Sequence, residues 1–311
     1  MDDSTAFYDY CGRCYVVEPI PIGSGRESLV YHVLNLNSTC IKVYKNRSVS
    51  RNKEDKLKAM IRKASEMNLD SLAWPCKLIF DDKNAFAGYA MPQFENNQTF
   101  DSLFRNAEKL SFMNIRDKLL ILLNFLYIIK RIHSCGYVIG DFNPSNFAIA
   151  KNFQVFFYDL DSLQFTDEIS EISYPCVTCA KGYLAPELIK LCRKYSNWFS
   201  ELPFPAFTQY TDLFSIAVII AQVLLDGRYP YLNISTTNHC SNLNFHVEEN
   251  TCIFRPKYFC LLDKEIFDEI PENIMDLLGK AFIDGYKNPY KRVTEIEWVN
   301  AINPLILNND N

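Results

Sequence analysis

Two short polar segments near the middle of the chain carry the residue types that phosphoryl transfer uses. Asp141 precedes Asn146 by five residues, and Asp159 follows Asn146 by thirteen. In this order and spacing, the first carboxylate orients an attacking hydroxyl, while the amide oxygen and the second carboxylate hold the magnesium ions that screen ATP phosphates. The alternative is a polar turn between two strands, because Asn, Asp, Pro and Ser are frequent in turns.

A further carboxylate, Asp161, competes with Asp159 as the metal ligand. The spacing from Asn146 favours Asp159. Alternate residues of an extended segment lie on the same face, so both carboxylates are expected to line the site. Asp161 would then be either an additional magnesium ligand or a contact that supports the ligand.

A glycine-containing turn upstream fits the binding of phosphates. Gly23, Ser24 and Gly25 lie between two predicted strands, and Val30 follows in the second of them. Glycines at such a place let the backbone turn approach phosphates closely. A Gly-x-Gly sequence at a hairpin is also common without any ligand, so this motif needs support from its neighbours.

Lys42 lies in an apolar strand, twelve residues after Val30. A lysine that points inward from such a strand needs an anionic partner. ATP phosphates and a carboxylate from the next helix would serve, and Glu54 shares the apolar face of that helix with Leu57 and Ile61. The alternative is an edge lysine with a buried stem and a solvated ammonium group.

Length, composition and charge restrict the class of protein. The chain has 311 residues, of which 48% are hydrophobic, and this predicts a globular protein with an ample core. The net charge of −5 gives no reason to expect a nucleic-acid partner. The longest apolar runs, 119–129 and 213–225, are shorter than the ~20 residues of a membrane span. The acidic start is unlike a signal peptide, so we expect a cytoplasmic protein, or one delivered to another cell's cytosol.

The eleven cysteines are scattered and odd in number. Without a secretory signal, reduced thiols are the expected state. Two pairs have Cys-x-x-Cys spacing, Cys11 with Cys14 and Cys176 with Cys179. A four-thiolate zinc site is one interpretation of these pairs. Incidental spacing is the other, and the lack of a zinc-ribbon context around either pair favours it.

Hydrophobic periodicity indicates a β-rich first part and a helical second part. Up to about residue 92 the chain alternates as strands, interrupted by one amphipathic helix after residue 50. From about residue 111 the pattern is mostly helical, while the Asn-, Ser- and Thr-rich segment 233–250 predicts a loop. The predicted strands include 39–44 and 77–80, and the predicted helices are 115–134, 184–193, 211–225, 272–283 and 294–302.

Later motifs follow in an order that is typical of one enzyme family. Ala185-Pro186-Glu187 matches the A-P-E motif that ends an activation segment, Asp212 opens a buried helix, and Arg292 lies where a late arginine pairs with the A-P-E glutamate. With these motifs the chain resembles a eukaryotic-type protein kinase domain over nearly its whole length. Among kinases it is most similar to an atypical bacterial, YegI-like branch.

This resemblance implies a fold and a division of the chain. We expect a single α+β kinase domain with a bilobal, protein-kinase-like fold. The β-rich N-lobe, with one main helix, would span residues 1–92, and the helical C-lobe would span residues 93–311. In kinases the Asp at the position of Asp212 ties the catalytic-loop backbone to its helix.

The resemblance also implies roles for individual residues. Lys42 would position the ATP phosphates, and Asp141 would orient a substrate hydroxyl and accept its proton. Glu54 would pair with Lys42, and Asn146 would hold magnesium. The glycine turn with Val30 would cover the nucleotide.

The segment from Met91 to Phe94 resembles a kinase hinge, which binds adenine through its backbone. Pro92 has no N–H group but keeps its carbonyl. If Met91 guards the pocket, the Pro92 carbonyl and the Phe94 N–H would contact the adenine. The alternative is that these residues only connect two lobes.

Several positions depart from the kinase pattern. Ile139 and Gly140 replace the His and Arg of H-R-D, and Asn143 replaces a lysine that touches the transferred phosphate. Asp161 replaces the Gly of D-F-G. The lost arginine is the usual partner of an activation-loop phosphate, so activation by loop phosphorylation is not expected.

Three functions fit these observations. The first is an ATP- and Mg²⁺-dependent kinase that acts on Ser or Thr hydroxyls of proteins. The second is a nucleotide-binding pseudokinase or scaffold, although a dead site would have no use for paired buried charges. The third is a small-molecule kinase of the aminoglycoside or choline type, which the A-P-E segment and Arg292 disfavour because they build a platform for protein substrates.

Overall fold

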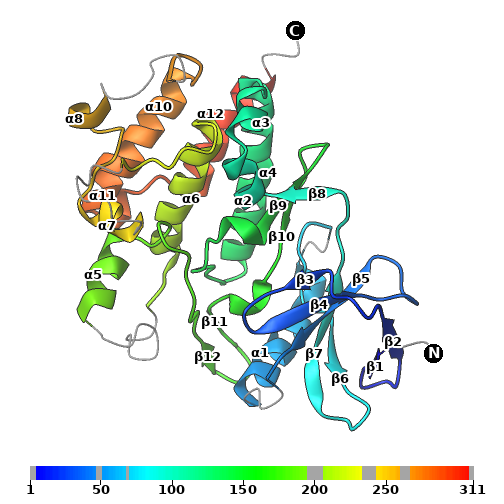
Figure 1. Cartoon of the computed structure of the whole chain (residues 1–311). Helices are drawn as coiled ribbons and strands as arrows, with labels where there is room; N and C mark the ends of the chain where they lie inside the picture. Colours follow the sequence, from blue (N-terminus) through cyan, green and yellow to red (C-terminus); the bar gives the residue numbers. More distant parts are fainter. Residues whose placement is uncertain are drawn as a thin grey trace. The chain divides into compact units, whose positions relative to one another are not determined.

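The structure, a computed structural model, describes residues 5–46, 51–67, 70–194, 206–232, 243–259 and 267–307. These residues form two compact units (Figure 1). The first takes in the described residues up to Asn96 together with Phe156–Asp161, and the second takes in the rest. The sequence placed Phe156–Asp161 in the C-lobe, whereas Phe157 forms a β-bridge with Leu72 of the first unit.

An antiparallel seven-stranded sheet builds the first unit, in the order β2-β1-β6-β7-β5-β4-β3. Helix α1 (Arg51–Arg62) packs on β6 and β7 with Leu57 and Met60 fully buried, as its apolar periodicity predicts. The strands are β1 (Thr5–Tyr8), β2 (Cys14–Val17), β3 (Gly23–Ser24), β4 (Ser28–His32), β5 (Thr39–Tyr44), β6 (Lys77–Phe80) and β7 (Phe86–Pro92), and a 3-10 turn at Ala64–Glu66 follows α1.

Helices dominate the second unit. Helix α4 (Ile115–Ser134) packs against α6 (Gln209–Leu224) and α12 (Glu295–Leu307), and the three lie side by side in Figure 1. Strand β8 (Asn97–Thr99) pairs antiparallel with β9 (Phe147–Ala150). The other helices are α2 (Phe100–Arg105), α3 (Ala107–Ser111), α5 (Pro186–Lys194), α7 (Leu243–Glu248), α8 (Pro256–Phe259), α10 (Glu272–Gly279) and α11 (Gly285–Lys287), with a π-helical turn at Lys280–Asp284.

Short elements carry the polar segments singled out in the sequence. A 3-10 turn at Pro144–Asn146 precedes β9, and β10 (Val155–Phe157) leads toward a second 3-10 turn at Leu160–Ser162. Strands β11 (Phe165–Thr166) and β12 (Ser173–Tyr174) form a small hairpin. A last 3-10 turn, Pro289–Lys291, comes before Arg292.

The predicted mixed α+β architecture, with a β-rich first part and a helical second part, is confirmed, and several boundaries are close. β5, β6 and α4 have the predicted bounds. The predicted loop at 233–250 is wrong in part, because α7 forms at 243–248, where Val247 is fully buried. The remainder of that segment, 233–242, lies outside the described residues. Within the described part of the chain, no helix is long and apolar enough to cross a membrane.

Candidate functional site

Lys42 points from β5 into the interior of the first unit. Its neighbours in the sheet are Val30 on β4 and Tyr89 on β7. The side chain is 9% exposed, and its ammonium binds the carboxylates of Asp161, at 2.5 Å, and Asp159. Burial alone would lower the pKa of Lys42, but the two carboxylates outweigh it and raise the pKa. Lys42 is therefore a buried, charged lysine and not an edge lysine in contact with solvent.

Asp161 is more deeply buried than Asp159 and also accepts hydrogen bonds from two tyrosines. Its Oδ1 also accepts a hydrogen bond from the Tyr89 hydroxyl at 2.9 Å, and its Oδ2 accepts one from Tyr44 at 2.7 Å. Burial would raise the pKa of Asp161, but Lys42 and these donors hold it well below its usual range. The side chain of Asp161 is 6% exposed, whereas that of Asp159 is 42% exposed.

The sheet geometry explains why these donors meet one carboxylate. Tyr44 follows Lys42 by two residues on β5, so both side chains lie on the same face of the sheet. Tyr89 lies directly opposite Lys42 on β7. Three donors from two neighbouring strands therefore converge, and the segment after β10 places Asp161 against them.

The expected ion pair between Lys42 and Glu54 is not formed among the described residues. The carboxylate of Glu54 binds Lys58 at 2.7 Å, one turn along α1, and lies 3.5 Å from the Tyr10 hydroxyl. Glu54 and Lys58 are four residues apart on one helix, so their ion pair forms locally. Lys42 is already neutralised by Asp159 and Asp161 and needs no further carboxylate. The helical periodicity did not reveal the competition for the Glu54 carboxylate.

The glycine turn forms a hairpin between β3 and β4. Gly23 lies opposite Val30, and the Gly25 N–H donates to the Ser28 carbonyl at 3.0 Å. A Cβ at Gly23 or Gly25 would meet neighbouring atoms at 3.5 Å or more, which is ordinary van der Waals contact. Neither residue has a positive φ. Neither packing nor backbone conformation requires glycine here, and close approach of a ligand to this turn stays a prediction.

The hinge-like residues continue the sheet. Met91 and Pro92 are the last residues of β7, and the Pro92 carbonyl lies 3.7 Å from the Cys40 thiol, a weak donor. The ring of Phe94 stacks on Phe156, with 4.4 Å between ring centroids. Adenine binding by Met91, Pro92 and Phe94 stays a prediction.

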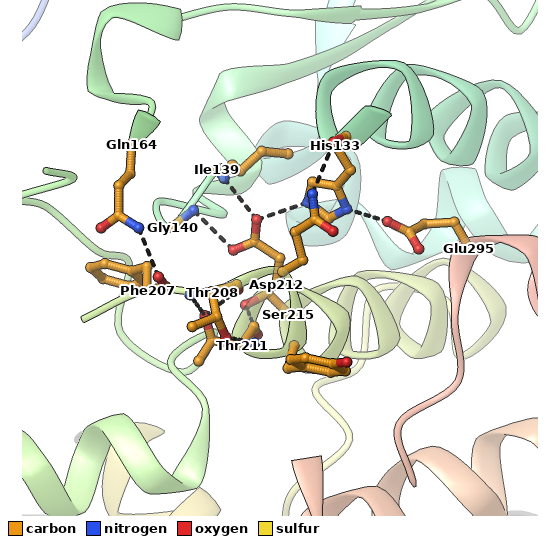
Figure 2. Close-up of polar contacts among 12 residues, drawn as sticks. His133, Ile139, Gly140, Gln164, Phe207, Thr208, Thr211, Asp212, Ser215 and Glu295 are labelled. Atoms are coloured by element: carbon orange, nitrogen blue, oxygen red, sulfur yellow. Dashed lines mark hydrogen bonds and ion pairs between the residues drawn. The ribbon is translucent and has the colours of Figure 1, made fainter. Parts of the chain in front are cut away.

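In the second unit, Asp212 holds the backbone of the predicted catalytic loop, as Figure 2 shows. This residue lies in the first turn of α6 and accepts hydrogen bonds from the N–H groups of Ile139, at 2.7 Å, and Gly140, at 3.0 Å. The predicted tie between Asp212 and the loop is confirmed.

Gly140 has a physical reason to replace the Arg of H-R-D. Its φ is +70°, and a Cβ there would lie 2.8 Å from the Cys176 Sγ and 3.1 Å from the ring of Phe207. A side chain at this position would be strained in its backbone and would clash.

His133, for which no function was predicted, extends this network. Its Nε2 lies 2.9 Å from Asp212, and its Nδ1 contacts the Glu295 carboxylate of α12 (Figure 2). Burial would lower the pKa of His133, but the hydrogen bonds to the two carboxylates raise it to about 9. The imidazolium thus links the end of α4 to both α6 and α12.

Asp141 and Asn146 are both buried in the second unit and belong to one tight turn. The Asp141 N–H donates to the Ile139 carbonyl at 2.7 Å, and the Asn146 N–H donates to the Asn143 carbonyl at 2.8 Å. The Asn143 side chain accepts from the Ser145 N–H at 3.0 Å. Asn143, at the position of a kinase lysine, therefore caps the 3-10 turn that carries Asn146.

The cysteines show no sign of a metal centre in the ranges that the structure describes, where no three His, Cys, Asp or Glu side chains could hold an ion together. Burial and the nearby Asp141 carboxylate raise the pKa of Cys179 to about 12. A thiol with such a pKa stays protonated at neutral pH and is a poor nucleophile.

Glu187 and Arg292 form the predicted ion pair. Their contacts are bidentate, at 2.7 and 2.6 Å, and the arginine also donates to the carbonyls of Tyr210 and Gly285. The Arg292 side chain is 1% exposed, and its guanidinium lies 5.5 Å from the ring centroid of Phe214. The pair ties the start of α5 to the segment before α12.

Comparisons with known proteins agree with this arrangement. The chain is 24% identical over 260 residues to Protein kinase YegI of Escherichia coli O157:H7, covering 81% of the chain and 37% of that protein. For Protein kinase YegI of E. coli strain K12 the identity is 24% over 230 residues, covering 71% of the chain and 33% of that protein. The chain is a protein-kinase-like domain that resembles YegI.

The fold of this kinase-like domain also matches a solved structure, the kinase domain of a rhoptry antigen specific to Toxoplasma gondii. The match has a TM-score of 0.62 and 11% sequence identity, and it covers 99% of the chain and 87% of that structure. No protein-family model matches the chain. The chain spans about a third of the length of the curated relatives that it matches.

Proposed function

We propose that this kinase-like domain transfers the γ-phosphoryl group of ATP, with Mg²⁺, to Ser or Thr hydroxyls of proteins. The observation that carries the proposal is the buried Lys42 ammonium, bonded to two carboxylates of the segment 159–161. A buried cation beside acidic residues suits a ligand that brings both phosphates and metal ions.

The residues present fit Mg²⁺ and ATP. Asp159 offers a carboxylate that is 42% exposed, and magnesium prefers such oxygen ligands. The buried Nδ2 of Asn146 has no hydrogen-bond partner in the described part of the molecule, so no internal bond fixes the orientation of its amide. The amide oxygen is thus available as a ligand. When bound, Mg·ATP supplies the transferable phosphoryl group with its charge screened.

Each group of the chain then has a defined task. Lys42 binds and orients phosphate oxygens, and the backbone around Gly23, Ser24 and Gly25 accommodates them closely. Asn146 and Asp159 hold the metal. Asp141 orients the substrate hydroxyl and takes its proton.

Two further features complete the proposal. Met91, Pro92 and Phe94 bind the adenine. The partly buried Glu187–Arg292 pair supports a protein substrate rather than a small molecule, because it anchors the end of the activation segment. We propose no nucleic-acid partner, given the net charge of −5.

A nucleotide-binding pseudokinase is the second candidate function. Ile139 and Gly140 stand where H-R-D has His and Arg, and this observation favours it. However, the loop keeps its support without that histidine, because Asp212 holds its backbone and His133 contacts Asp212. A measurement of nucleotide binding separates both candidates from a domain that binds no nucleotide.

That measurement is a thermal-shift titration with Mg·ATP. At a hundredfold excess over Kd, binding should stabilise the fold by ~2.7 kcal/mol. Lys42→Met should abolish the shift, because the apolar side chain cannot bind phosphates. An unchanged melting temperature of the wild-type protein at millimolar Mg·ATP would refute the proposal.

A further inference from the structure

We propose that Asp161, held by Tyr44 and Tyr89, is the fixed counter-ion of Lys42, so that this lysine is positioned without any carboxylate from helix α1. This inference rests on the proposed function, since it assigns a positioning residue to the same site. It also separates the two neighbouring carboxylates: Asp159 is the one offered to metal, and Asp161 is the one that orients the lysine.

The contacts of Asp161 support the assignment. Both of its carboxylate oxygens are engaged: Oδ1 by Lys42 at 2.5 Å and Tyr89 at 2.9 Å, and Oδ2 by Tyr44 at 2.7 Å. Tyrosine hydroxyls and the lysine ammonium are donors that compensate a buried carboxylate. With 6% exposure and both oxygens engaged, Asp161 is less open to a metal ion than Asp159, whose side chain is 42% exposed.

The rigidity of the three donors also supports Asp161 as the fixed counter-ion of Lys42. Lys42 and Tyr89 are direct cross-strand neighbours, and Tyr44 lies two residues from Lys42 on the same face of β5. Tyr44 and Tyr89 are both almost fully buried, so their rotamers are set by packing. Asp161 is therefore held by a preformed cluster within the sheet.

Helix α1 supplies no competing carboxylate. Glu54, the candidate from the sequence, is engaged by Lys58 at 2.7 Å. A cation of α1 does reach this cluster: the Lys53 ammonium lies 4.2 Å from the ring centroid of Tyr44 and 2.8 Å from Glu27. A displacement of α1 would thus leave the lysine and its counter-ion paired. We infer that activity is not controlled by making and breaking a contact between Lys42 and this helix.

The experiment measures how fast the Lys42 amine is acylated by sulfosuccinimidyl acetate in the nucleotide-free protein, read by peptide mass spectrometry. Asp161→Asn should speed acylation of Lys42 about tenfold, the factor that one charge-assisted hydrogen bond corresponds to. Glu54→Gln and its matched control Asp55→Asn should each change it less than about twofold, as for exposed charges. If Glu54→Gln speeds acylation as much as Asp161→Asn does, the inference is wrong.

Lys118 serves as an internal reference for unfolding. It is fully buried and paired with Asp226 at 2.7 Å, so its acylation should stay slow in every folded variant. Should Asp161→Asn unfold the protein and expose Lys118, Tyr44→Phe replaces it as the test, because it removes one donor and keeps the ring. This variant should speed Lys42 acylation about threefold, less than Asp161→Asn does, because Tyr44 acts on the lysine only by holding Asp161 in place. If Tyr44→Phe leaves the acylation rate of Lys42 unchanged while Lys118 stays protected, the inference is contradicted.

A second arm uses protection of Lys42 by Mg·ATP and separates this inference from the proposed function. In the wild type, Mg·ATP should slow the acylation. No protection would refute the proposed function, and the nucleotide-free rates would still decide the counter-ion. In Asp159→Asn, protection of Lys42 by Mg·ATP should need a higher Mg²⁺ concentration. In Asp161→Asn, Mg·ATP should protect Lys42 poorly at every Mg²⁺ concentration. If high Mg²⁺ fully restores the protection of Lys42 in Asp161→Asn, Asp161 is a metal ligand and the inference is wrong.

Discussion

At the scale of residues, this domain supports its predicted catalytic groups with unexpected partners. Lys42 is paired with Asp161 and Asp159 rather than with Glu54. Asp212 is contacted by His133 from α4, while the H-R-D histidine position holds Ile139. In both cases a buried charge is matched by an opposite charge from another element, because an unmatched one would cost too much.

The protonated His133 predicts a pH dependence of stability. Its pKa is about 9 in the folded protein against an ordinary value of 6.5, so the folded state holds the proton more tightly. The resulting stabilisation, about 3 kcal/mol, is complete below pH 6.5 and is lost as the pH rises through 9. Urea unfolding between pH 6 and pH 10 should show this loss. His133→Gln should lack that component of the slope, and parallel curves for the two proteins would refute the assignment.

Replacing Asp141 by Asn tests its proposed role as the base. The substitution keeps the shape of a buried side chain, so melting temperature and Mg·ATP affinity should stay close to wild type. Turnover should fall about 10²–10⁴-fold, the usual contribution of a positioned base. Single-turnover phosphoryl transfer at saturating ATP measures this. Turnover within a factor of a few of wild type would remove Asp141 from the mechanism.

At the scale of elements, local patterns predicted what local interactions determine. The bounds of α4 follow from its apolar periodicity, and Asn114 caps its first turn. The six-residue helix α7 was missed because it lies in a polar segment and owes its burial to contacts with distant parts such as α5. Short helices of this kind depend on tertiary packing more than on propensity.

Arg292 should be a major source of stability for the second unit. Arg292→Ala should cost about 2–3 kcal/mol, because it removes a buried side chain and leaves two backbone carbonyls and the partly exposed Glu187 without their partner. The matched control is Arg193→Ala: Arg193 also pairs with a glutamate, Glu248, but its side chain is 61% exposed, so the loss should be under about 1 kcal/mol. Equal losses in urea unfolding would show that burial does not distinguish the two pairs.

Replacing Gly140 in the predicted catalytic loop by alanine should lower the stability of the fold. Gly140→Ala should destabilise the fold by about 1–3 kcal/mol, because its φ is positive and its Cβ would collide with Cys176. Gly279→Ala is the control, since a Cβ there meets nothing within 4 Å and the backbone is helical, so about 0.5–1 kcal/mol should be gained. If Gly140→Ala unfolds at the same urea concentration as wild type, the loop does not require glycine.

At the scale of the whole molecule, the order of motifs along the chain predicted the kinase-like fold. It could not predict contacts that depend on which of several charges come together. His133 and Glu295 are 162 positions apart and meet because α4 packs on α12. Nothing in either local sequence marks them as partners. The same holds for Asp161 with Tyr44 and Tyr89, which the sheet register brings together.

Phosphorylation of a general protein substrate decides whether this kinase-like domain transfers phosphate to protein hydroxyls, as we propose. The wild-type protein is incubated with γ-labelled ATP, Mg²⁺ and dephosphorylated casein, and the label is mapped by mass spectrometry. We expect label on Ser or Thr side chains, dependent on Mg²⁺ and lost in Asp141→Asn. Label no higher than in Asp141→Asn, from a protein that Mg·ATP stabilises, would contradict it and leave a nucleotide-binding pseudokinase.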